Sequence, residues 1–432
     1  MLCQKTAILE TSKSRIDVSS LSFSNLPIHD LTQSHTSADV LPQTFTEWIS
    51  HDGKARSQVP RILELCLNNE TNILFGKFVD ENLKLDLLKQ LNKLHFGESG
   101  LVGFFTSGST GKRKLVVHKM SNLVESACSL VESYPEVRGR VTYSAFPTSY
   151  MAGILNNFIV PLVANSPIVL DKEFDFSTRF RITQTFKDFD VEWAWMSPGM
   201  LQALTNQRNN HFKLEPLKLI LSATGPLSDT SRIESSHLLE VPILNTYGLT
   251  EVLFVSGEKD MKSRVYLGQA FYGVRMILSK ENLLEITTKT IPHSLYQLDG
   301  DTLRPISAFD NCNSFLTSDI AKYEDGELRL LGRIDDVVVL RGVNVSLSEI
   351  ELATHGLKGV LASCARKVVT SHGEDIELLI ELADDVKLSV IDIRRQLLKF
   401  LPPDCVPGRV SIVKLPRLDS GKVDRPKIRG SI

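Results

Sequence analysis

The chain has 432 residues, of which 42% are hydrophobic and 23% are charged, and its formal net charge is −2. This composition is ordinary for a soluble globular chain, and the near-neutral charge gives no electrostatic basis for binding nucleic acid. No apolar stretch reaches the roughly 20 residues of a membrane span, and the first residues lack the apolar core of a secretion signal. The six cysteines are scattered without a CxxC pair, which favours reduced thiols and a cytoplasmic location.

The first informative segment is a Gly/Ser-rich loop at residues 106–114, TSGSTGKRK, which follows the apolar run 101–105. The run has the length and aromatic content of a buried strand. Glycines allow close approach of backbone N–H groups to an anion, and hydroxyls and lysines add donors. The spacing excludes a Walker loop. Taken alone, the loop fits a basic surface turn better than a phosphate site. The residues expected to bind phosphate are Thr106, Ser107, Gly108, Ser109, Thr110, Gly111 and Lys114.

A second short strand is expected at residues 241–244, and it leads into the segment Tyr247-Gly248-Leu249-Thr250-Glu251. The tyrosine ring can stack on a purine, and the Thr250 hydroxyl can donate to a phosphoryl oxygen. Glu251 offers the hard oxygen that Mg²⁺ prefers. The alternatives are a half-buried core aromatic for Tyr247 and a helix N-terminal acid for Glu251.

The C-terminal part of the chain predicts a small mixed α+β domain. Ser346 and Glu349 have the spacing of a helix capping box. Strands are expected at 359–369 and 376–382, and a helix at 389–400. Lys422 lies between glycine and valine near the end of the chain, where its flexible ammonium could neutralise an anionic ligand. The alternative is one more lysine in a basic tail.

In this order, the segments from about Leu101 to the end resemble the adenylate-forming ligase superfamily, the acyl-CoA synthetases and carrier-protein adenylation domains. The string GRIDDVVVLRGVNVSLSEIE from Gly332 is the longest match, and the loop keeps the family pattern except for Arg113, where proline is usual. The resemblance implies an α/β fold with mixed sheets and packed helices in a large domain, and a mobile α+β lid. The expected divisions are a reduced N-terminal region at 1–99, the core at 100–334 and the lid at 335–432.

The resemblance also implies a role for each matching residue. Tyr247 would hold adenine, Thr250 the α-phosphate and Glu251 the metal. Asp319 would accept both ribose hydroxyls, and Arg333 would act beside it on the nucleotide. The remaining assignments are Gly225 along the adenine, Tyr150, Gly153, Ser222 and Gly342 along the acyl pocket and thiol channel, Asp335 as the hinge, and Lys422 as the residue that promotes adenylation.

The implied activity is ATP-dependent activation of a small carboxylic acid with Mg²⁺, followed by thioester formation with coenzyme A. Loading the phosphopantetheine of an acyl carrier protein, or acylating an amine, uses the same first half-reaction. A non-catalytic descendant that binds nucleotide or acyl groups is the alternative from a different class, because the region ahead of the phosphate loop is short.

One short segment resembles a substrate-binding motif, but we do not assign it that role. Residues 174–177 read FDFS, similar to the segment in which amino-acid adenylation domains place an aspartate against the substrate's ammonium. Its distance from the phosphate loop is wrong, and residues 146–153 already occupy that place without an acid. We interpret Asp175 as a helix-entry residue. A buried ammonium without a partner would cost several kcal/mol, so the sequence favours an acid that lacks an α-amino group.

Overall fold

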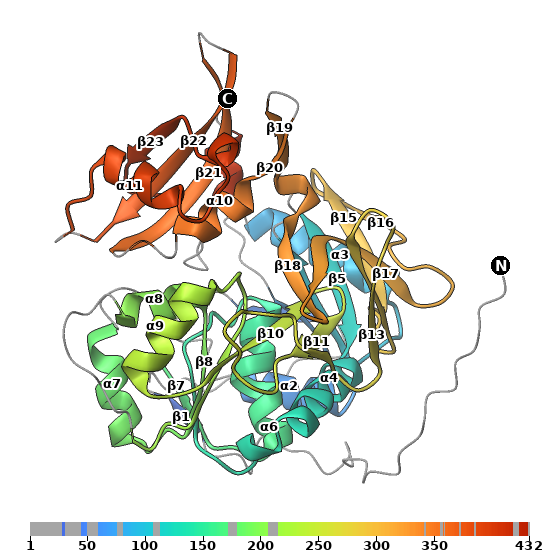
Figure 1. Ribbon diagram of the computed structural model, residues 1–432. Coiled ribbons are helices and arrows are strands. Elements are labelled where there is room, and N and C mark those ends of the chain that lie inside the picture. The colour runs from blue at the N-terminus through green and yellow to red at the C-terminus, as the bar shows by residue number, and fades with distance from the viewer. Residues whose placement is uncertain are drawn as a thin grey trace.

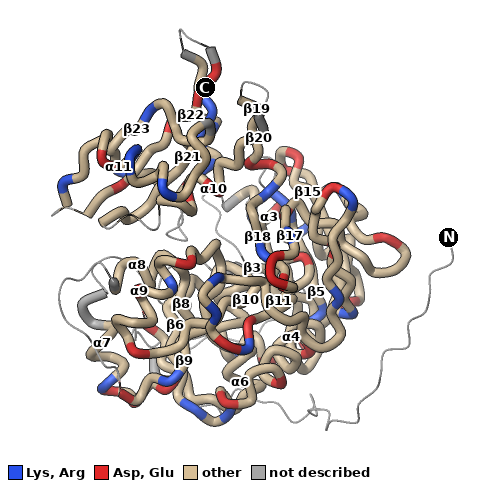
Figure 2. The backbone as a smooth tube through the Cα atoms, viewed as in Figure 1, with Lys and Arg blue, Asp and Glu red and all other residues tan. Residues whose placement is uncertain are grey.

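The computed structural model describes residues 28–30, 45–49, 59–75, 81–106, 113–171, 179–205, 215–340, 343–354, 357, 359–370, 373–383, 386–417 and 423–430. It is an α/β structure of mixed sheets and packed helices, as predicted. A large body carries a smaller C-terminal lid, drawn in red (Figure 1). Basic and acidic residues are interspersed over both parts (Figure 2). Among the described helices, none is both long and apolar enough to cross a membrane.

The largest sheet of the described chain has eight strands, and from β1 to β10 they run parallel. Short helices connect them on both faces, so the strands are apolar along their length. Trp193 and Trp195 are fully buried between sheet and helices. In spatial order the strands are β1 (Ile28–Asp30), β7 (Ile168–Leu170), β6 (Thr142–Ser144), β8 (Trp193–Met196), β9 (Leu219–Ser222), β10 (Ile243–Leu249), β11 (Leu253–Gly257) and β12 (Gln269–Ala270).

The helices of this region follow the strands in chain order. Their bounds are η3 (Pro135–Val137), α5 (Met151–Ile154), η4 (Leu155–Ile159), α6 (Val160–Ala164), α7 (Arg179–Asp188), α8 (Pro198–Thr205) and α9 (Asp229–Leu239). The FDFS segment, with Asp175, lies outside the described residues just ahead of α7.

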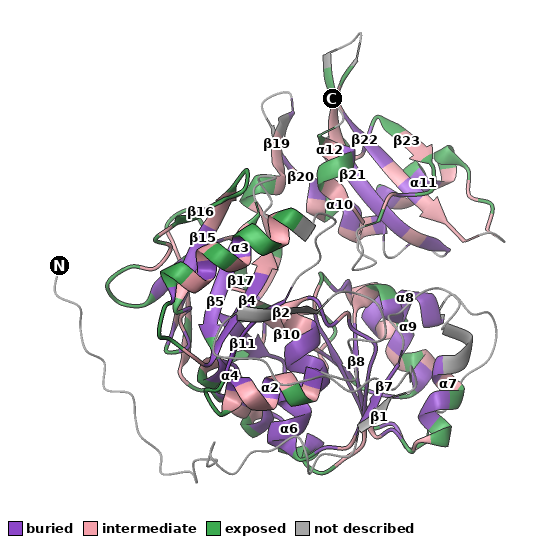
Figure 3. Ribbon diagram, turned by 180° about the vertical axis from the view of Figure 1, so that it is seen from behind, coloured by how far each residue is buried: buried purple, intermediate pink, exposed green. Residues whose placement is uncertain are grey.

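A six-stranded sheet brings together segments far apart in the sequence. Its hairpin of β4 and β5 carries the Gly/Ser-rich loop, and β15 pairs with β5 from the other side. Helix α4 is largely buried, whereas α3 keeps an exposed face (Figure 3). The elements are β16 (Thr302–Pro305), β15 (Ser294–Asp299), β5 (Lys114–Lys119), β4 (Leu101–Thr106), β3 (Asn72–Phe75), β2 (Phe45–Ile49), α2 (Val59–Leu67), α3 (Glu81–Leu94) and α4 (Met120–Ser133).

A four-stranded antiparallel sheet completes the large body and leads to the lid. Its last strand continues into the 3₁₀ turn η5 (Ile334–Asp336). The strands are β13 (Val274–Leu278), β14 (Leu283–Thr288), β17 (Ser314–Glu324) and β18 (Glu327–Arg333).

The lid has a hydrophobic core of its own, formed by residues between Leu340 and Leu401. The expected capping residue is present, because the Glu349 N–H donates to Ser346 Oγ at 3.2 Å. The expected strands and helix are also present, although the helix ends earlier, at Leu397. The elements are β19 (Val337–Leu340), β20 (Val343–Ser346), α10 (Leu347–Thr354), β21 (Val360–Thr370), β22 (Gly373–Leu382), α11 (Val390–Leu397), η6 (Pro403–Cys405), β23 (Arg409–Ile412) and α12 (Arg425–Arg429).

The cysteines agree only in part with the expectation of reduced thiols. Cys66, Cys128, Cys364 and Cys405 are free. Cys312 is disulfide-bonded. Burial raises the pKa of the Cys128 thiol to about 11, so this side chain is a neutral thiol at physiological pH.

Candidate active site

The phosphate loop is held at both ends by the β4–β5 hairpin. Thr106 and Lys114 form the last residue pair of this antiparallel ladder, and both are half-buried. The intervening candidates Ser107, Gly108, Ser109, Thr110 and Gly111 lie outside the described residues. The hairpin therefore brings together the two ends of the loop, and phosphate binding by the loop stays a prediction.

A tyrosine and an arginine from two strands meet the buried carboxylate of an aspartate on a third strand. The Tyr247 hydroxyl on β10 donates a hydrogen bond to Asp319 Oδ2 on β17. Arg333 Nη1 on β18 lies 3.6 Å from Asp319 Oδ1. Asp319 is 4% exposed, and burial raises the pKa of its carboxyl. Burial and the nearby Asp319 charge raise the pKa of Tyr247, which keeps the phenol a hydrogen-bond donor.

Strand register places Asp319 opposite Arg333. The two residues pair across the β17–β18 ladder, and the register shifts just after Ile320. Gly332 has a φ of +149°, and a Cβ at this position would lie 3.0 Å from Ser346 Oγ. A side chain there would be strained and crowded, so glycine is required for the strand to reach the arginine in this geometry.

The turn between β10 and β11 carries Thr250 and Glu251, both half-buried. A histidine that the sequence analysis missed anchors this turn, because His118 Nε2 on β5 lies 2.8 Å from the Thr250 carbonyl oxygen. Burial lowers the pKa of His118 to about 4, so the ring is neutral and its Nε2–H donates to the carbonyl. The only available signal was a histidine within the apolar strand of residues 115–118.

Glu251 is free to bind a ligand in this structure. Within the described part of the chain its carboxylate makes no hydrogen bond or ion pair, although it lies close enough to Tyr247 to raise the pKa of that phenol. A half-buried carboxylate without a protein partner fits a divalent cation with a preference for oxygen.

The carboxyl ends of β9 and β10 meet beside the turn. Ser222 is fully buried, and its carbonyl oxygen accepts a hydrogen bond of 3.0 Å from Thr246 Oγ1. A Cβ built on Gly225 would meet nothing nearer than Pro198 Cδ at 3.8 Å. The packing of the fold therefore does not demand glycine at this position, and close approach of a ligand at Gly225 stays a prediction.

Glycine at position 153 has a different explanation. A Cβ there would lie 1.8 Å from the Pro147 carbonyl oxygen, so α5 can pack on its preceding turn only with glycine. Tyr150 immediately precedes this helix and is half-buried. Packing alone therefore explains why position 153 is glycine. The acyl-pocket role of Tyr150 and Gly153 stays a prediction.

The expected hinge residue is linked to the buried site. Asp335 lies in η5, and its Oδ2 is 3.4 Å from Arg333 Nη2. Gly342 and Lys422 lie outside the described residues. Arg417 and Val423, which bracket the segment 418–422, pair as an antiparallel bridge.

A protein-family model described as "AMP-binding enzyme" matches residues 43–288, more than half of the chain. The chain belongs to the AMP-binding enzyme family. The resemblance inferred from the four segments is thereby confirmed at the level of the superfamily.

Two curated relatives indicate the range of this family. Delta-poly-L-ornithine synthetase of Acinetobacter baumannii is 27% identical over 355 residues, covering 75% of this chain and 26% of the relative. Mitochondrial malonate–CoA ligase ACSF3 of Mus musculus is 23% identical over 380 residues, covering 77% of this chain and 64% of the relative. This chain thus spans less than two thirds of the length of either relative.

The fold is also that of solved members of the superfamily. ATP-bound MatB from Rhodopseudomonas palustris superimposes with a TM-score of 0.70 at 19% identity, over 94% of this chain and 88% of MatB. At this level of identity the likeness concerns the fold.

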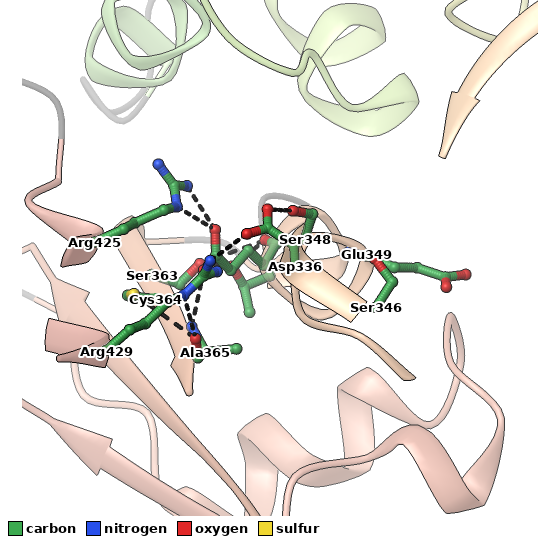
Figure 4. Close-up of polar contacts among 11 residues, drawn as sticks. Asp336, Ser346, Ser348, Glu349, Ser363, Cys364, Ala365, Arg425 and Arg429 are labelled. Atoms are coloured by element: carbon green, nitrogen blue, oxygen red, sulfur yellow. Dashed lines mark hydrogen bonds and ion pairs between the residues drawn. The ribbon is translucent and has the colours of Figure 1, made fainter. Parts of the chain in front are cut away.

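In the C-terminal part of the chain, Arg425 and Arg429 converge on one carboxylate, and Arg429 also contacts Asp336 (Figure 4). Glu351 on α10 is 3% exposed. Its Oε2 accepts from Arg425 Nη2 at 2.5 Å, and its Oε1 accepts from Arg429 Nη2 at 2.9 Å. Arg429 also pairs with Asp336 of η5. The sequence analysis mentioned a basic tail only as the alternative for Lys422, and it did not predict these pairs, because Glu351 and Asp336 lie far from both arginines in the sequence.

Proposed function

We propose that the protein activates a carboxylic acid with ATP through an acyl adenylate and then forms a thioester with coenzyme A. The observation that supports this proposal is the buried carboxylate of Asp319, which Tyr247 and the partly exposed Arg333 contact. A carboxylate can accept hydrogen bonds from two neighbouring hydroxyls, which is the pattern that a ribose presents. Burial raises the pKa of that carboxyl, which means that its charged form is destabilised. A ligand that donates two hydrogen bonds would stabilise the charged form again.

The remaining groups of the site follow from this placement of the ribose. The Tyr247 ring would lie along the adenine, and Gly225 would leave room for it. Thr250 would donate to the α-phosphate, and the loop at 106–114 would hold the outer phosphates with its backbone N–H groups. His118 would keep the Thr250 turn in position. The fold shared with ATP-bound MatB supports ATP as the nucleotide.

Magnesium is part of this proposal, and Glu251 would hold it. Bound Mg²⁺ would supply charge neutralisation at the phosphate oxygens. The groups of this chain would hold the nucleotide, align the carboxylate with the α-phosphorus and exclude water.

In the first half-reaction the carboxylate oxygen would attack the α-phosphorus of ATP, and the bond to the bridging oxygen of pyrophosphate would break. Lys422 would offset the charge that builds between the two anions. In the second half-reaction the lid, residues 335–432, would turn about Asp335 against the body formed by residues 1–99 and 100–334. The Gly342 loop would then reach the site, a thiol would attack the acyl carbon, and AMP would leave.

The acid is proposed to lack an α-amino group, because residues 146–153 contain no acidic side chain. Coenzyme A is the favoured acceptor, and the name of the malonate–CoA ligase relative supports it. The name of the polyornithine synthetase relative supports an amine as an alternative acceptor. An acyl carrier protein is the other alternative. A cytoplasmic location, where ATP is abundant, belongs to the same proposal.

The test is pyrophosphate release over a panel of carboxylic acids, with and without coenzyme A. We expect release with at least one acid that lacks an α-amino group, and thioester formation when coenzyme A is present. If pyrophosphate release requires an amine or a carrier protein, that molecule is the acyl acceptor instead of coenzyme A. No release with any acid, from protein that still binds ATP, would favour a non-catalytic nucleotide-binding descendant.

Variants separate the two half-reactions. Lys422→Ala should abolish acid-dependent ATP–pyrophosphate exchange and leave thioester formation from supplied acyl adenylate intact. Lys414→Ala, at an exposed lysine of the same segment, is the control and should retain both activities. Equal loss of both half-reactions in Lys422→Ala would refute the role of this lysine.

Asp319→Asn should weaken ATP binding by about 10-fold or more, because a hydrogen bond to a charged group contributes about 1.5–3 kcal/mol.

A further inference from the structure

Three side chains with metal-ligating atoms meet at one end of the six-stranded sheet. His95 follows α3, Glu98 lies in the turn that leads into β4, and His293 immediately precedes β15. His95 Nδ1 is 2.6 Å from Glu98 Oε2, and His293 Nε2 is 2.9 Å from the same oxygen. All three ligand atoms lie within 4.8 Å of one another.

The buried histidine of this group is held in one orientation from behind. His95 is 6% exposed, and its Nε2 lies 2.9 Å from the hydroxyl of Tyr296, which is 4% exposed. Ser294 Oγ is 3.3 Å from the same nitrogen. If Nε2 carries the proton and donates it to the Tyr296 hydroxyl, the lone pair of Nδ1 points toward Glu98. Metal-binding histidines typically have their second nitrogen fixed in this way.

We propose that His95, Glu98 and His293 bind a zinc ion. Two imidazole nitrogens and one carboxylate oxygen form a common zinc ligand set, in which water completes a tetrahedron. Bonds of about 2.0 Å would set neighbouring ligand atoms about 3.3 Å apart, so Glu98 Oε2 and each imidazole nitrogen need to separate by less than 1 Å, and the two imidazole nitrogens already lie within 4.8 Å of each other. Glu98 and His293 are partly exposed, so they can make this movement and admit an ion from solvent.

The ligand chemistry also selects among metals. Mg²⁺ and Ca²⁺ prefer sites made of oxygen ligands, and the two imidazoles disfavour them. This cation site is therefore distinct from the one proposed at Glu251. It also lies at the Leu101 end of β4, whereas the phosphate loop follows the Thr106 end.

The ion would have a structural effect. Glu98 and His293 are separated by 195 residues in the sequence, and a shared ion would join the α3–β4 connection to β15. The competing interpretation is a carboxylate that accepts hydrogen bonds from two imidazoles without any metal. In that arrangement both histidines must direct an N–H at Glu98, and zinc would not stabilise the protein.

The experiment uses the full chain, treated with a chelator and then dialysed. Zn²⁺ alone is titrated by calorimetry, and the thermal midpoint is followed as zinc is added. Co²⁺ serves as a spectroscopic probe, because tetrahedral and octahedral cobalt absorb differently. We expect about one ion per chain, a raised thermal midpoint and a tetrahedral cobalt spectrum.

Variants locate the site. Glu98→Gln and His293→Gln should each abolish this binding step, and Tyr296→Phe should weaken it by about tenfold, the effect of losing a supporting hydrogen bond. His237→Gln, at an exposed histidine of α9, should bind zinc as the unaltered protein does. Absence of zinc binding by the unaltered protein, or unchanged binding by Glu98→Gln, would overturn the proposal. Calorimetry of the chelated variants shows separately whether they are folded.

Discussion

His118 shows how one buried side chain makes stability depend on pH. Its pKa is about 4 in the folded chain, against an ordinary value of 6.5. Between these values the unfolded chain binds more protons, so the free energy of unfolding rises with pH. The contribution is complete above pH 6.5 and is lost by about 1.4 kcal/mol per pH unit as pH falls toward 4.

The expected result is a shallower pH dependence in His118→Gln, whose amide can still donate to the Thr250 carbonyl. Urea unfolding at pH 7, 6 and 5 measures it. An identical dependence in the variant and the unaltered protein would mean that the imidazole is not the group that titrates.

Two glycines near the site should respond differently to the same substitution. Gly153→Ala places a methyl group against the Pro147 carbonyl, and we expect a loss of about 1–3 kcal/mol in the free energy of unfolding. Gly225→Ala meets no close atom, so its stability should change by no more than about 0.5 kcal/mol. Its affinity for ATP should fall if the nucleotide approaches the backbone there. Chemical unfolding and ATP titration of both variants test this contrast, and unchanged ATP affinity in Gly225→Ala would contradict the assigned role.

At the scale of elements, α10 and α12 are joined by the buried pairs of Glu351. Glu351 is buried whereas Arg425 and Arg429 are partly exposed, so Glu351→Gln, which loses charge-assisted hydrogen bonds, should cost about 1–3 kcal/mol. Since α12 follows the segment that carries Lys422, ATP–pyrophosphate exchange should fall as well. Glu349→Gln on the same helix is the control, because Glu349 is exposed. Equal stability of the two variants would show that the buried pairs contribute little.

Elements with a strong local pattern could be predicted from the sequence. The strand ahead of the Gly/Ser-rich loop, the cap at Ser346 and the lid strands depend on residues close together in the chain, and all are present. That Asp319 and Arg333 act side by side was predicted only from the family resemblance. Local patterns could not predict it, because it depends on the register between β17 and β18. The bond from His118 to Thr250 spans 132 residues, and no local pattern encodes such a pair.

The basic tail illustrates the same limit. The sequence places Arg425 and Arg429 four residues apart in a run of cations, which is typical of a solvated surface. In the structure their shared partner is Glu351, whose burial depends on how α10 packs against β21. Charge pattern alone therefore does not show that both arginines pair with a buried carboxylate.

For the whole molecule, the described contact between body and lid includes Gln202 of α8, which is 8% exposed. Its side-chain amide donates to the carbonyl of Val360, the first residue of β21. Gln202→Leu would leave that carbonyl without this donor, at a cost of about 1–3 kcal/mol where it stays buried. We expect a broader distribution of distances between spin labels on body and lid. Gln184→Leu, at an exposed glutamine of α7, should leave the distribution unchanged.

The pairing of β15 with β5 also constrains the order in which the protein can mature on the ribosome. Strand β5 ends at Lys119, but its neighbour begins only at Ser294. At about 5–20 residues per second, the unsatisfied edge of β5 waits on the order of ten seconds or more for its partner to be synthesised. During that interval the nascent chain exposes a template for intermolecular pairing. Recombinant fragments that stop before residue 294 are therefore expected to aggregate, and slower translation should increase the demand for chaperones.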